Sequence, residues 1–285
     1  MAQIDILLAS YKGEQYIKTQ ILSLISQTFT DWNLIIHDDG SLDSTVEIVK
    51  KFCNIDKRIR IIEDNIVFQN AAMNFMHLLK YSTAEFIMFC DQDDLWFDNK
   101  IELMFSILSK KNQTIPQVVY CNSYVWIPNE GIKGLATLTF PKDLQSFLFL
   151  NSGIQGCASI FNKKMLDLLL CWEGECAMHD HLLHLIGLTI GKVTYIHIPL
   201  MLYRNHEKNV TGKTATKIIS WNKISNHRNI PVVDLRHYNT VKSYVKIYGN
   251  KLTINNIRIL QQYLSMPKKK IFKRLVIIIK YKFQI

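Results

Sequence analysis

The chain has 285 residues, of which 48% are hydrophobic and 20% are charged, a composition that supplies one large core and excludes a disordered protein. Its six cysteines form no CxxC pair, which predicts reduced thiols rather than disulfides or a zinc centre. No basic leader precedes the first apolar run, and no run approaches the ~20 residues needed to cross a bilayer. We therefore expect a globular protein of the cytoplasm.

The net charge of +10 is unevenly distributed along the chain. Residues 213–285 hold 16 Lys and Arg and one acid, Asp234, a net charge of +15, whereas residues 1–212 carry −5. This asymmetry predicts two regions, a main domain over 1–212 and a basic, mainly helical region over 213–285. The pattern of elements changes near Pro116, so we divide the main domain into halves, 1–115 and 116–212.

Strands and helices alternate through the first half. Apolar runs predict strands at QIDILLAS (3–10), NLIIHDDG (33–40), RIRIIE (58–63) and EFIMFC (85–90). Between and after them, apolar residues recur at helical spacing, as at Ile101, Met104, Phe105 and Leu108. This alternation predicts an α/β fold, with a mostly parallel sheet and helices on both faces.

The second half has a mixed pattern. QVVYCN (117–122) and GCASIFN (156–162) are typical of strands, and residues 179–190 are typical of a helix. KVTYIHIPLMLYRNH (192–206) contains two short strand-like runs, which we expect to be separated at Pro199.

Two acidic clusters follow predicted strands, at the sheet edge where ligands of such folds bind. In DQDD, three carboxylates occupy four residues from Asp91 to Asp94. Two like charges about 4 Å apart repel by roughly 4 kcal/mol at a surface-like dielectric. A hard cation, Mg²⁺ or Mn²⁺, would offset that repulsion together with substrate phosphates. The structural alternative is a helix cap at Asp94 or Asp98, which we consider weaker because the cluster follows a buried strand.

The second cluster is HDDGS, His37 to Ser41. Gly40 permits a tight turn, and Asp38 or Asp39 could accept a hydrogen bond from a base N–H or a ribose hydroxyl. A capped turn between strand and helix explains the same residues equally well.

Longer stretches resemble family 2 glycosyltransferases, which have the GT-A fold. ILLASYKGEQYI, QTFTDWNLIIHDDGSLDST and FIMFCDQDDLWFDNK resemble their nucleotide-sugar half. GCASIFNKKMLDL, MHDHLL and GKVTYIHIPLMLYRNHEKNVTG resemble their acceptor half, in the right order up to about Gly212. The resemblance implies an inverting transfer of a sugar, assisted by Mg²⁺ or Mn²⁺, from a nucleotide-sugar donor to an acceptor hydroxyl.

The resemblance also implies roles for individual residues. Asp180, in MHDHLL, matches the acid that deprotonates the acceptor. The expected nucleotide-binding residues are Ala9, Ser10, Tyr11, Glu14, Asp39, Asp91 and Asp93. The expected metal ligands are Asp93, Asp94 and His206, and which of Asp91, Asp93 and Asp94 binds the metal directly is left open. The residues expected near the acceptor or the phosphates are Trp96, Gly156, Cys157, His179 and Arg204.

Several of these residues have structural alternatives. Trp96 is more typical of packing beneath the acids than of stacking on a sugar, and Cys157 is more typical of a buried thiol. For Arg204 and His206, an ordinary polar loop is as good an explanation. His179, His181 and His184 are spaced along one predicted helix without the second cluster that a tetrahedral zinc site needs.

The C-terminal stretch PKKKIFKRLVIIIKYKF begins at Pro267 and contains seven Lys or Arg. Its apolar residues recur at helical spacing, which predicts a basic amphipathic helix on an anionic membrane surface. A helix packed on the main domain is the alternative. Nucleic acid is a third alternative, but we expect no such partner because no RNA- or DNA-reading motif accompanies the charge.

Together these features predict a peripheral enzyme on the inner face of the cell membrane, acting on a lipid-linked glycan during synthesis of a surface polysaccharide such as O-antigen. DQDDLW, MHDHLL and YRNHEKN resemble rhamnosyltransferase-type members, which favours dTDP-rhamnose as donor over a UDP-hexose. A nucleotidyltransferase is the enzymatic alternative, although ASYKGEQYI lacks a Gly-rich basic loop. A non-catalytic basic adaptor for membrane or nucleic acid is the alternative of another class.

Overall fold

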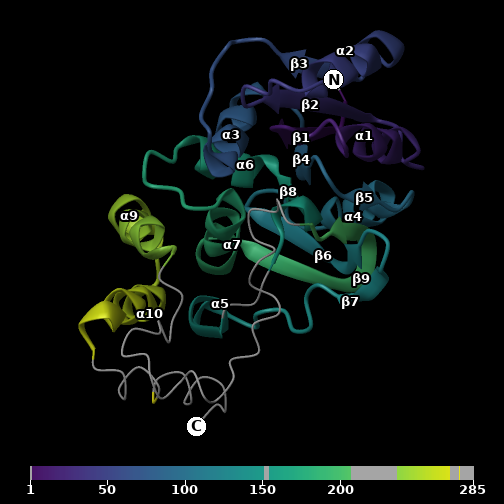
Figure 1. The fold of residues 1–285 in the computed structure, drawn as a ribbon. Coiled ribbons are helices and arrows are strands. Elements are labelled where there is room, and N and C mark those ends of the chain that lie inside the picture. Colours follow the sequence, from purple (N-terminus) through teal and green to yellow (C-terminus); the bar gives the residue numbers. More distant parts are fainter. Residues whose placement is uncertain (1, 151–153, 207–235, 270–275, 277–285) are drawn as a thin grey trace, which may run out of the picture.

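The computed structural model describes residues 2–150, 154–206 and 236–269, together with residue 276 (Figure 1). Its described strands form one sheet in the order β3-β2-β1-β4-β8-β6-β9-β5, with β7 paired to β6. The strands are β1 (Ile4–Ser10), β2 (Trp32–Asp38), β3 (Ile59–Ile62), β4 (Phe86–Asp91), β5 (Leu95–Trp96), β6 (Gln117–Ile127), β7 (Gly131–Leu135), β8 (Ser159–Asn162) and β9 (Lys192–Arg204). The helices are α1 (Ile17–Ile25), α2 (Thr45–Ile55), α3 (Ala71–Leu78), α4 (Lys100–Leu108), α5 (Leu144–Leu150), α6 (Lys163–Leu170), α7 (His179–Thr189), α9 (Tyr238–Tyr248) and α10 (Ile254–Leu264).

The first half is a parallel sheet, as predicted. β1 pairs in parallel with both β2 and β4, and β2 pairs in parallel with β3. In this register Ser10 lies beside Asp38, and Ala9 lies beside Asp91. The carboxyl ends of β1, β2 and β4 are therefore level, which brings both acidic clusters to one edge of the sheet.

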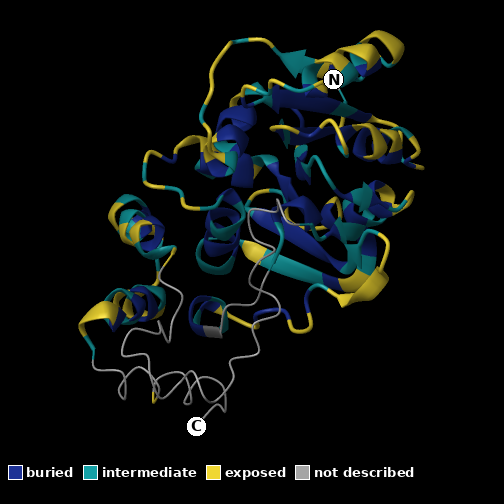
Figure 2. Ribbon diagram, viewed as in Figure 1, coloured by how far each residue is buried: buried dark blue, intermediate teal, exposed yellow. Residues whose placement is uncertain are grey.

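The sheet separates two apolar cores because side chains alternate along each strand. On β1, Leu7 belongs to one core, whereas Ile6 and Leu8 belong to the other. Helices α3, α6 and α7 cover the face of Leu7, and α1 and α4 cover the opposite face. Figure 2 shows the central strands buried, while much of α2 is exposed. Coverage of both faces explains why these strands are almost continuously apolar.

The second half of the sheet is mixed. β8 is antiparallel to β4 and β6, and β9 is parallel to β6. The expected break at Pro199 is wrong, because β9 is one strand of 13 residues. Pro199 lies beside Asn122, and the β6–β9 register shifts on either side of this pair. These irregularities let the strand accommodate a proline, which has no backbone N–H to donate. The β6–β7 hairpin has no counterpart in the prediction.

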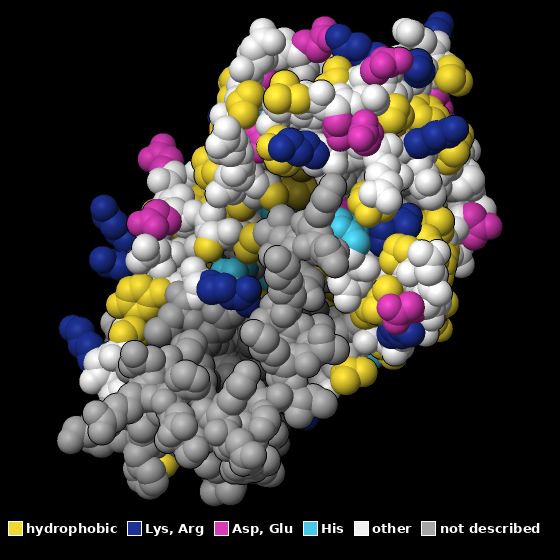
Figure 3. Space-filling model, in the orientation of Figure 1, with side chains coloured by type: hydrophobic (Ala, Val, Ile, Leu, Met, Phe, Trp, Pro, Cys, Tyr) yellow, Lys and Arg dark blue, Asp and Glu magenta, His cyan; other side chains and the backbone are white. Residues whose placement is uncertain are grey.

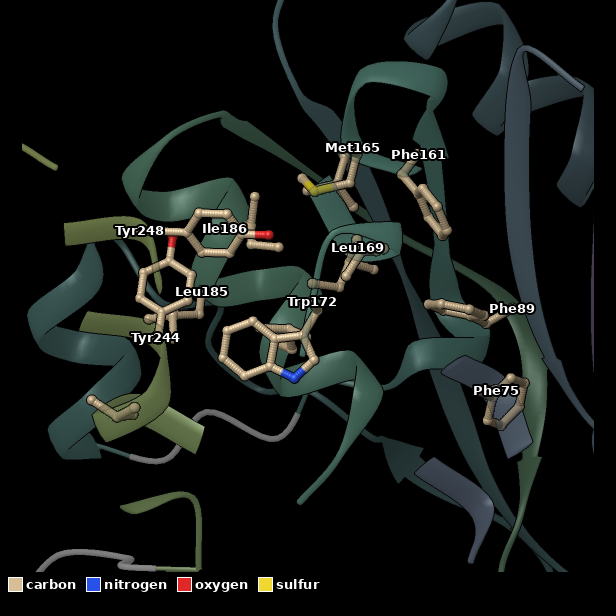
Figure 4. Packing of buried hydrophobic residues seen from close by; sticks show 14 of the residues in the cluster. Phe75, Phe89, Phe161, Met165, Leu169, Trp172, Leu185, Ile186, Tyr244 and Tyr248 are labelled. Carbon is tan, nitrogen blue, oxygen red and sulfur yellow. The ribbon is translucent and has the colours of Figure 1, made fainter. Parts of the chain in front are cut away.

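Helices α9 and α10 pack onto the main core. Figure 4 shows Tyr244 and Tyr248 of α9 near Trp172, and the Tyr248 hydroxyl donates to the carbonyl of Leu168. Leu260 of α10 is fully buried in the same cluster. The predicted membrane-binding helix falls mainly on residues 270–275 and 277–285, outside the described residues. Among the helices that the structure describes, none is both long and apolar enough to cross a membrane.

Candidate active site

The DQDD cluster lies between the end of β4 and the short strand β5. Asp91 ends β4, Asp93 is largely buried with 15% of its side chain exposed, and Asp94 is fully buried. β5 pairs with β9, placing Leu95 beside Leu202. This pairing places the end of β9 beside the Asp91–Asp94 loop, although the two segments are about a hundred residues apart in sequence.

Hydrogen bonds tie the end of β9 to the acids. The backbone N–H of Arg204 donates to Asp94 Oδ1 at 3.1 Å, and its Nε donates to the carbonyl of Asp93 at 2.7 Å. His206 Nε2 lies 2.8 Å from Asp93 Oδ2, and its ring stacks on Tyr16. The structure thus joins two of the expected metal ligands, Asp93 and His206, directly. The Asp94 carboxylate instead groups with Asp91 and the Cys157 thiol, whose candidate ligand atoms all lie within 4.8 Å of one another.

The carboxylates of this cluster are short of positive charge. Burial first, and then the charge of Asp93, raise the pKa of Asp91 to about 7. Burial and the charges of Asp93 and Asp91 raise the pKa of Asp94 well above its usual range. Asp94 Oδ2 is buried and has no nitrogen or oxygen hydrogen-bond partner in the described part of the chain. An unpaired buried carboxylate oxygen is costly, so this site is suited to a cation.

One buried cation lies beneath the acids. Lys100 is fully buried at the start of α4, where Nζ donates to the carbonyl of Cys157 at 2.7 Å and lies 3.4 Å from the centre of a Trp96 ring. Burial lowers the pKa of this lysine. Sequence reasoning missed Lys100. One signal in the sequence could have identified it. A lysine in the first turn of a predicted helix is disfavoured by the helix dipole, which indicates that Lys100 has another partner.

Asp180 lies in the first turn of α7. Its Oδ1 accepts the N–H of His181 at 2.7 Å, and burial raises its pKa to about 6. The charge of Asp180 in turn contributes to the raised pKa of Asp91, so the two carboxylates lie within electrostatic range. Gly156 makes this packing possible, because a Cβ there would lie 2.6 Å from His179 Nε2 and 3.1 Å from Asp180 Cβ.

The loops after β1 and β2 hold the residues expected to bind the nucleotide. Ser10 Oγ donates to Asp38 at 2.8 Å, and Glu14 accepts the N–H of Ser44 at 3.0 Å. Both oxygens of Asp39 accept backbone N–H groups, from Phe68 and from Asn70. Tyr11 is 44% exposed.

Gln92, which sequence reasoning also missed, connects the two acidic regions. Its side-chain oxygen accepts the N–H of Tyr11 at 3.0 Å, and its side-chain nitrogen donates to the carbonyl of Tyr11 at 2.9 Å. This pair of bonds ties the DQDD loop to the loop after β1. Gln92 lies between two acids, Asp91 and Asp93, and a glutamine there gave no signal of this contact.

Three residues expected near the acceptor are covered by other side chains. Trp96 is 2% exposed, Cys157 is 1% exposed and His179 is 4% exposed. Trp96 packs on Lys100, and His179 stacks on Phe75 with its pKa lowered by burial to about 3. Arg204 is also largely buried, with its guanidinium over the ring of Trp126. Trp96, Cys157 and His179 are thus buried side chains, and the Cys157 sulfur lies within 4.8 Å of carboxylate oxygens of Asp91 and Asp94. Their expected roles near the acceptor stay a prediction.

Comparisons with known proteins identify the family of the chain. The profile of Glycosyl transferase family 2 matches residues 5–170, more than half of the chain. An Escherichia coli UDP-Glc:alpha-D-GlcNAc-diphosphoundecaprenol beta-1,3-glucosyltransferase is 34% identical over 157 residues, which cover 55% of this chain and 58% of that protein. A Shigella flexneri dTDP-rhamnosyl transferase is 27% identical over 234 residues, covering 78% and 79% of the two chains.

Solved structures show the same fold. The Staphylococcus aureus TarS fragment in complex with UDP-GlcNAc has a TM-score of 0.61 at 16% identity, with 93% of this chain and 72% of that chain covered. A mannosyltransferase from Pyrobaculum calidifontis, in complex with GDP-Man and Mn²⁺, has a TM-score of 0.56 at 13% identity, with 93% and 70% covered. The fold is GT-A, and the chain belongs to glycosyl transferase family 2, whose members use nucleotide-sugar donors.

Proposed function

We propose that this glycosyltransferase is inverting and metal-dependent, with Asp180 as the catalytic base. The observation that carries the proposal is the cluster of acids after β4, in which Asp93 contacts His206, Asp94 groups with Asp91, and Asp91 lies within electrostatic range of Asp180. An inverting transfer needs a cation on the departing diphosphate and one base at the acceptor hydroxyl. Separate elements supply these two groups here, since β4 and β9 hold the first and α7 holds the second.

The metal site fits a divalent cation. The unpaired Oδ2 of Asp94 and the crowding of Asp91, Asp93 and Asp94 leave negative charge that Lys100 alone does not neutralise. Asp93 and His206 would hold the ion, with Asp94 as a further or supporting ligand. Carboxylate oxygens with one imidazole suit Mn²⁺ or Mg²⁺. When bound, the ion would stabilise the charge on the diphosphate leaving group.

For the donor, we propose that the loops after β1 and β2 receive the nucleotide. Ala9, Ser10 and Tyr11 would line the base and ribose side, Asp39 would face the pyrimidine ring N–H, and Glu14 would order the neighbouring loop. Asp91, at the end of β4, would lie near the ribose. Support comes from the alignment of β1, β2 and β4 in one register.

We propose that Asp180 takes the proton of the acceptor hydroxyl. Its raised pKa supports this role, because a base whose pKa is closer to neutrality is better suited to proton transfer. Gly156 would position this carboxylate by allowing α7 to approach η2 (Gly156–Ala158). Arg204 would position the acidic loop through the Asp93 carbonyl rather than bind phosphate directly.

The substrates are part of the proposal. One relative is named for a UDP-glucose donor and a diphosphoundecaprenol-linked acceptor, and another is named as a dTDP-rhamnosyl transferase. They support dTDP-rhamnose or a UDP-hexose as donor and a lipid-linked glycan as acceptor. We also propose the division at residues 212 and 213 and the peripheral membrane location, for which the basic composition of residues 213–285 is the support. On the face shown in Figure 3, described Lys and Arg side chains are dispersed among acidic and neutral ones.

The experiment is a transfer assay with a panel of dTDP-, UDP- and GDP-sugars and lipid diphosphate acceptors, with Mn²⁺, with Mg²⁺ and with EDTA. We expect one donor class to be used only with metal, and the His206→Ala variant to need more metal for half-maximal rate. Turnover that is unchanged by EDTA, in protein shown to be free of bound metal, would contradict metal dependence.

A further inference from the structure

A second cluster of titratable side chains lies outside the site described above. Asp64, directly after β3, accepts hydrogen bonds through both carboxylate oxygens. Oδ1 lies 3.1 Å from His37 Nε2 and accepts the N–H of Ile66, while Oδ2 lies 2.6 Å from His77 Nε2 and accepts the Tyr81 hydroxyl at 2.8 Å. His37 is 1% exposed and His77 is 7% exposed, so the cluster is largely shielded from water.

Both ring nitrogens of His37 have polar partners. The side-chain nitrogen of Asn74 donates to the His37 carbonyl, and the Asn74 oxygen lies 2.7 Å from His37 Nδ1. His37 Nε2 faces Asp64 Oδ1, so the ring connects Asn74 to Asp64. Although burial opposes it, hydrogen bonds from His77, Ile66, Tyr81 and His37 hold the pKa of Asp64 well below its usual range.

The cluster anchors the segment of residues 64–70, which we call the 64–70 loop. Phe68 packs near both histidine rings, 6.0 Å from His37 and 5.1 Å from His77 between ring centres. The loop contains two non-glycine residues with positive φ, Asn65 at 59° and Gln69 at 51°. Such residues are strained and persist only where surrounding contacts hold them.

The far end of the 64–70 loop is bonded to the proposed nucleotide carboxylate. Asp39 accepts the N–H groups of Phe68 and Asn70, and a Cβ on Gly40 would lie 3.1 Å from a Val67 methyl group. The loop is thus held by two carboxylates, Asp64 at its start and Asp39 at its end. A change in the position of the loop would move the donors that orient the side chain of Asp39.

We propose that His37, Asp64 and His77 form a hydrogen-bonded latch that holds the 64–70 loop against Asp39 and thereby positions that carboxylate for the nucleoside part of the donor. The inference rests on the proposed function, in which Asp39 faces the base. Tyr81 and Arg60, whose Nη2 donates to the Tyr81 carbonyl at 2.9 Å, are the other titratable or charged groups facing the latch. The three latch residues are positioning residues, because none of them contacts the nucleotide in this account.

The test compares Asp64→Asn with Asp56→Asn. Asp56 is a matched control. It precedes β3, whereas Asp64 follows it, and it is ion-paired to Arg58. Its side chain is 16% exposed, against 20% for that of Asp64. Hydrogen exchange of the 64–70 loop is measured without ligand. Calorimetry then measures the affinities for UDP, dTDP and inorganic pyrophosphate in the presence of Mn²⁺.

We expect Asp64→Asn to speed exchange in the 64–70 loop and to weaken binding of the preferred nucleoside diphosphate about tenfold, the equivalent of one charge-assisted hydrogen bond. Pyrophosphate affinity and kcat at saturating donor should stay within about twofold, because the latch acts on the nucleoside end. Asp56→Asn should change neither exchange in the loop nor nucleotide affinity. His77→Ala should act like Asp64→Asn and serves in its place if that variant does not fold, with His77→Gln as a milder change that keeps a donor.

Unchanged exchange in the 64–70 loop of folded Asp64→Asn protein would overturn the latch. Equal weakening of pyrophosphate and nucleotide binding, or the same weakening in Asp56→Asn, would overturn its role in positioning Asp39. One equivalent of tightly bound zinc that is lost in His77→Ala would also overturn it, since a metal and not a proton would then join the histidines to Asp64. If the wild-type protein binds no nucleoside diphosphate, the proposed function fails, and loop exchange still decides whether the latch exists.

Discussion

The two acidic clusters at the edge of the sheet differ in how their charges are satisfied. In the turn after β2, every carboxylate oxygen of Asp38 and Asp39 accepts at least one hydrogen bond from a hydroxyl or a backbone N–H. In the loop after β4, burial and like charges raise the pKa values of Asp91 and Asp94, although the Cys157 thiol is a hydrogen-bond partner of both. One oxygen of Asp94 has no nitrogen or oxygen partner among the described residues. The first cluster is satisfied within the protein, whereas the second is suited to bind a cation.

The comparison extends to Asp180, which lies within electrostatic range of Asp91 but is held by a different element, α7. Its replacement is expected to have the largest effect. Asp180→Asn keeps the size of the side chain and can still accept the His181 N–H, but it cannot take a proton at neutral pH. We expect a transfer rate at least ~100-fold lower, the low end of what general-base catalysis contributes, with donor affinity and Tm near wild type. Near-normal turnover in steady-state assays would show that Asp180 is not the base.

The pH dependence of that rate follows from the same carboxylate. Burial raises the pKa of Asp180 to about 6, and only the ionised form can act as a base. The rate at saturating substrates should therefore rise with pH, about tenfold per unit, below that value and become level above it. The residual rate of Asp180→Asn should lack this rise when measured over the same pH series. A wild-type profile that is flat from pH 5 to 8 would contradict the assignment.

Neutralising an acid in the turn after β2 should lower the free energy of unfolding more than neutralising an acid in the loop after β4. In Asp39→Asn, an amide nitrogen replaces one of two oxygens that accept backbone N–H groups, so one N–H loses its partner. We expect a loss of roughly 1–3 kcal/mol in the free energy of unfolding, measured by urea denaturation without metal. A variant as stable as wild type would show that these bonds are not essential to the turn.

Asp94→Asn should change the free energy of unfolding least, and any change should be an increase, whereas Asp39→Asn lowers it. The amide oxygen can keep the Arg204 N–H, while one of several crowded buried charges is removed. Without metal, we expect the free energy of unfolding to stay within about 1 kcal/mol of wild type or to rise. A loss as large as that of Asp39→Asn would remove the contrast between the two clusters.

The parallel half could be predicted from sequence because local signals agree there. In β1, β2 and β4, apolar runs end in polar residues, and helical spacing follows each one. Parallel pairing then places Ala9, Asp38 and Asp91 at one edge without further information. The mixed half gave weaker signals, since a proline inside β9 is tolerated only because the β6–β9 register shifts beside it.

The contacts that complete the site could not be predicted because they join residues distant in sequence. Lys100 bonds the carbonyl of Cys157, and Gln92 bonds the backbone of Tyr11. Burial decided the other differences. Trp96 and His179 have residue types that suit sugar binding, but the side chains packed over them show that they belong to the core.

The central claim, that the DQDD cluster and His206 hold a divalent cation with the donor diphosphate, is tested most directly by calorimetric binding of UDP and dTDP with and without Mn²⁺. We predict that Mn²⁺ strengthens nucleotide binding to wild type, and that the Asp93→Asn, Asp94→Asn double variant loses this metal-dependent gain while its Tm is retained. Asp98→Asn, an exposed acid outside the cluster, should behave as wild type. The same Mn²⁺-dependent gain in the double variant as in wild type would contradict the account.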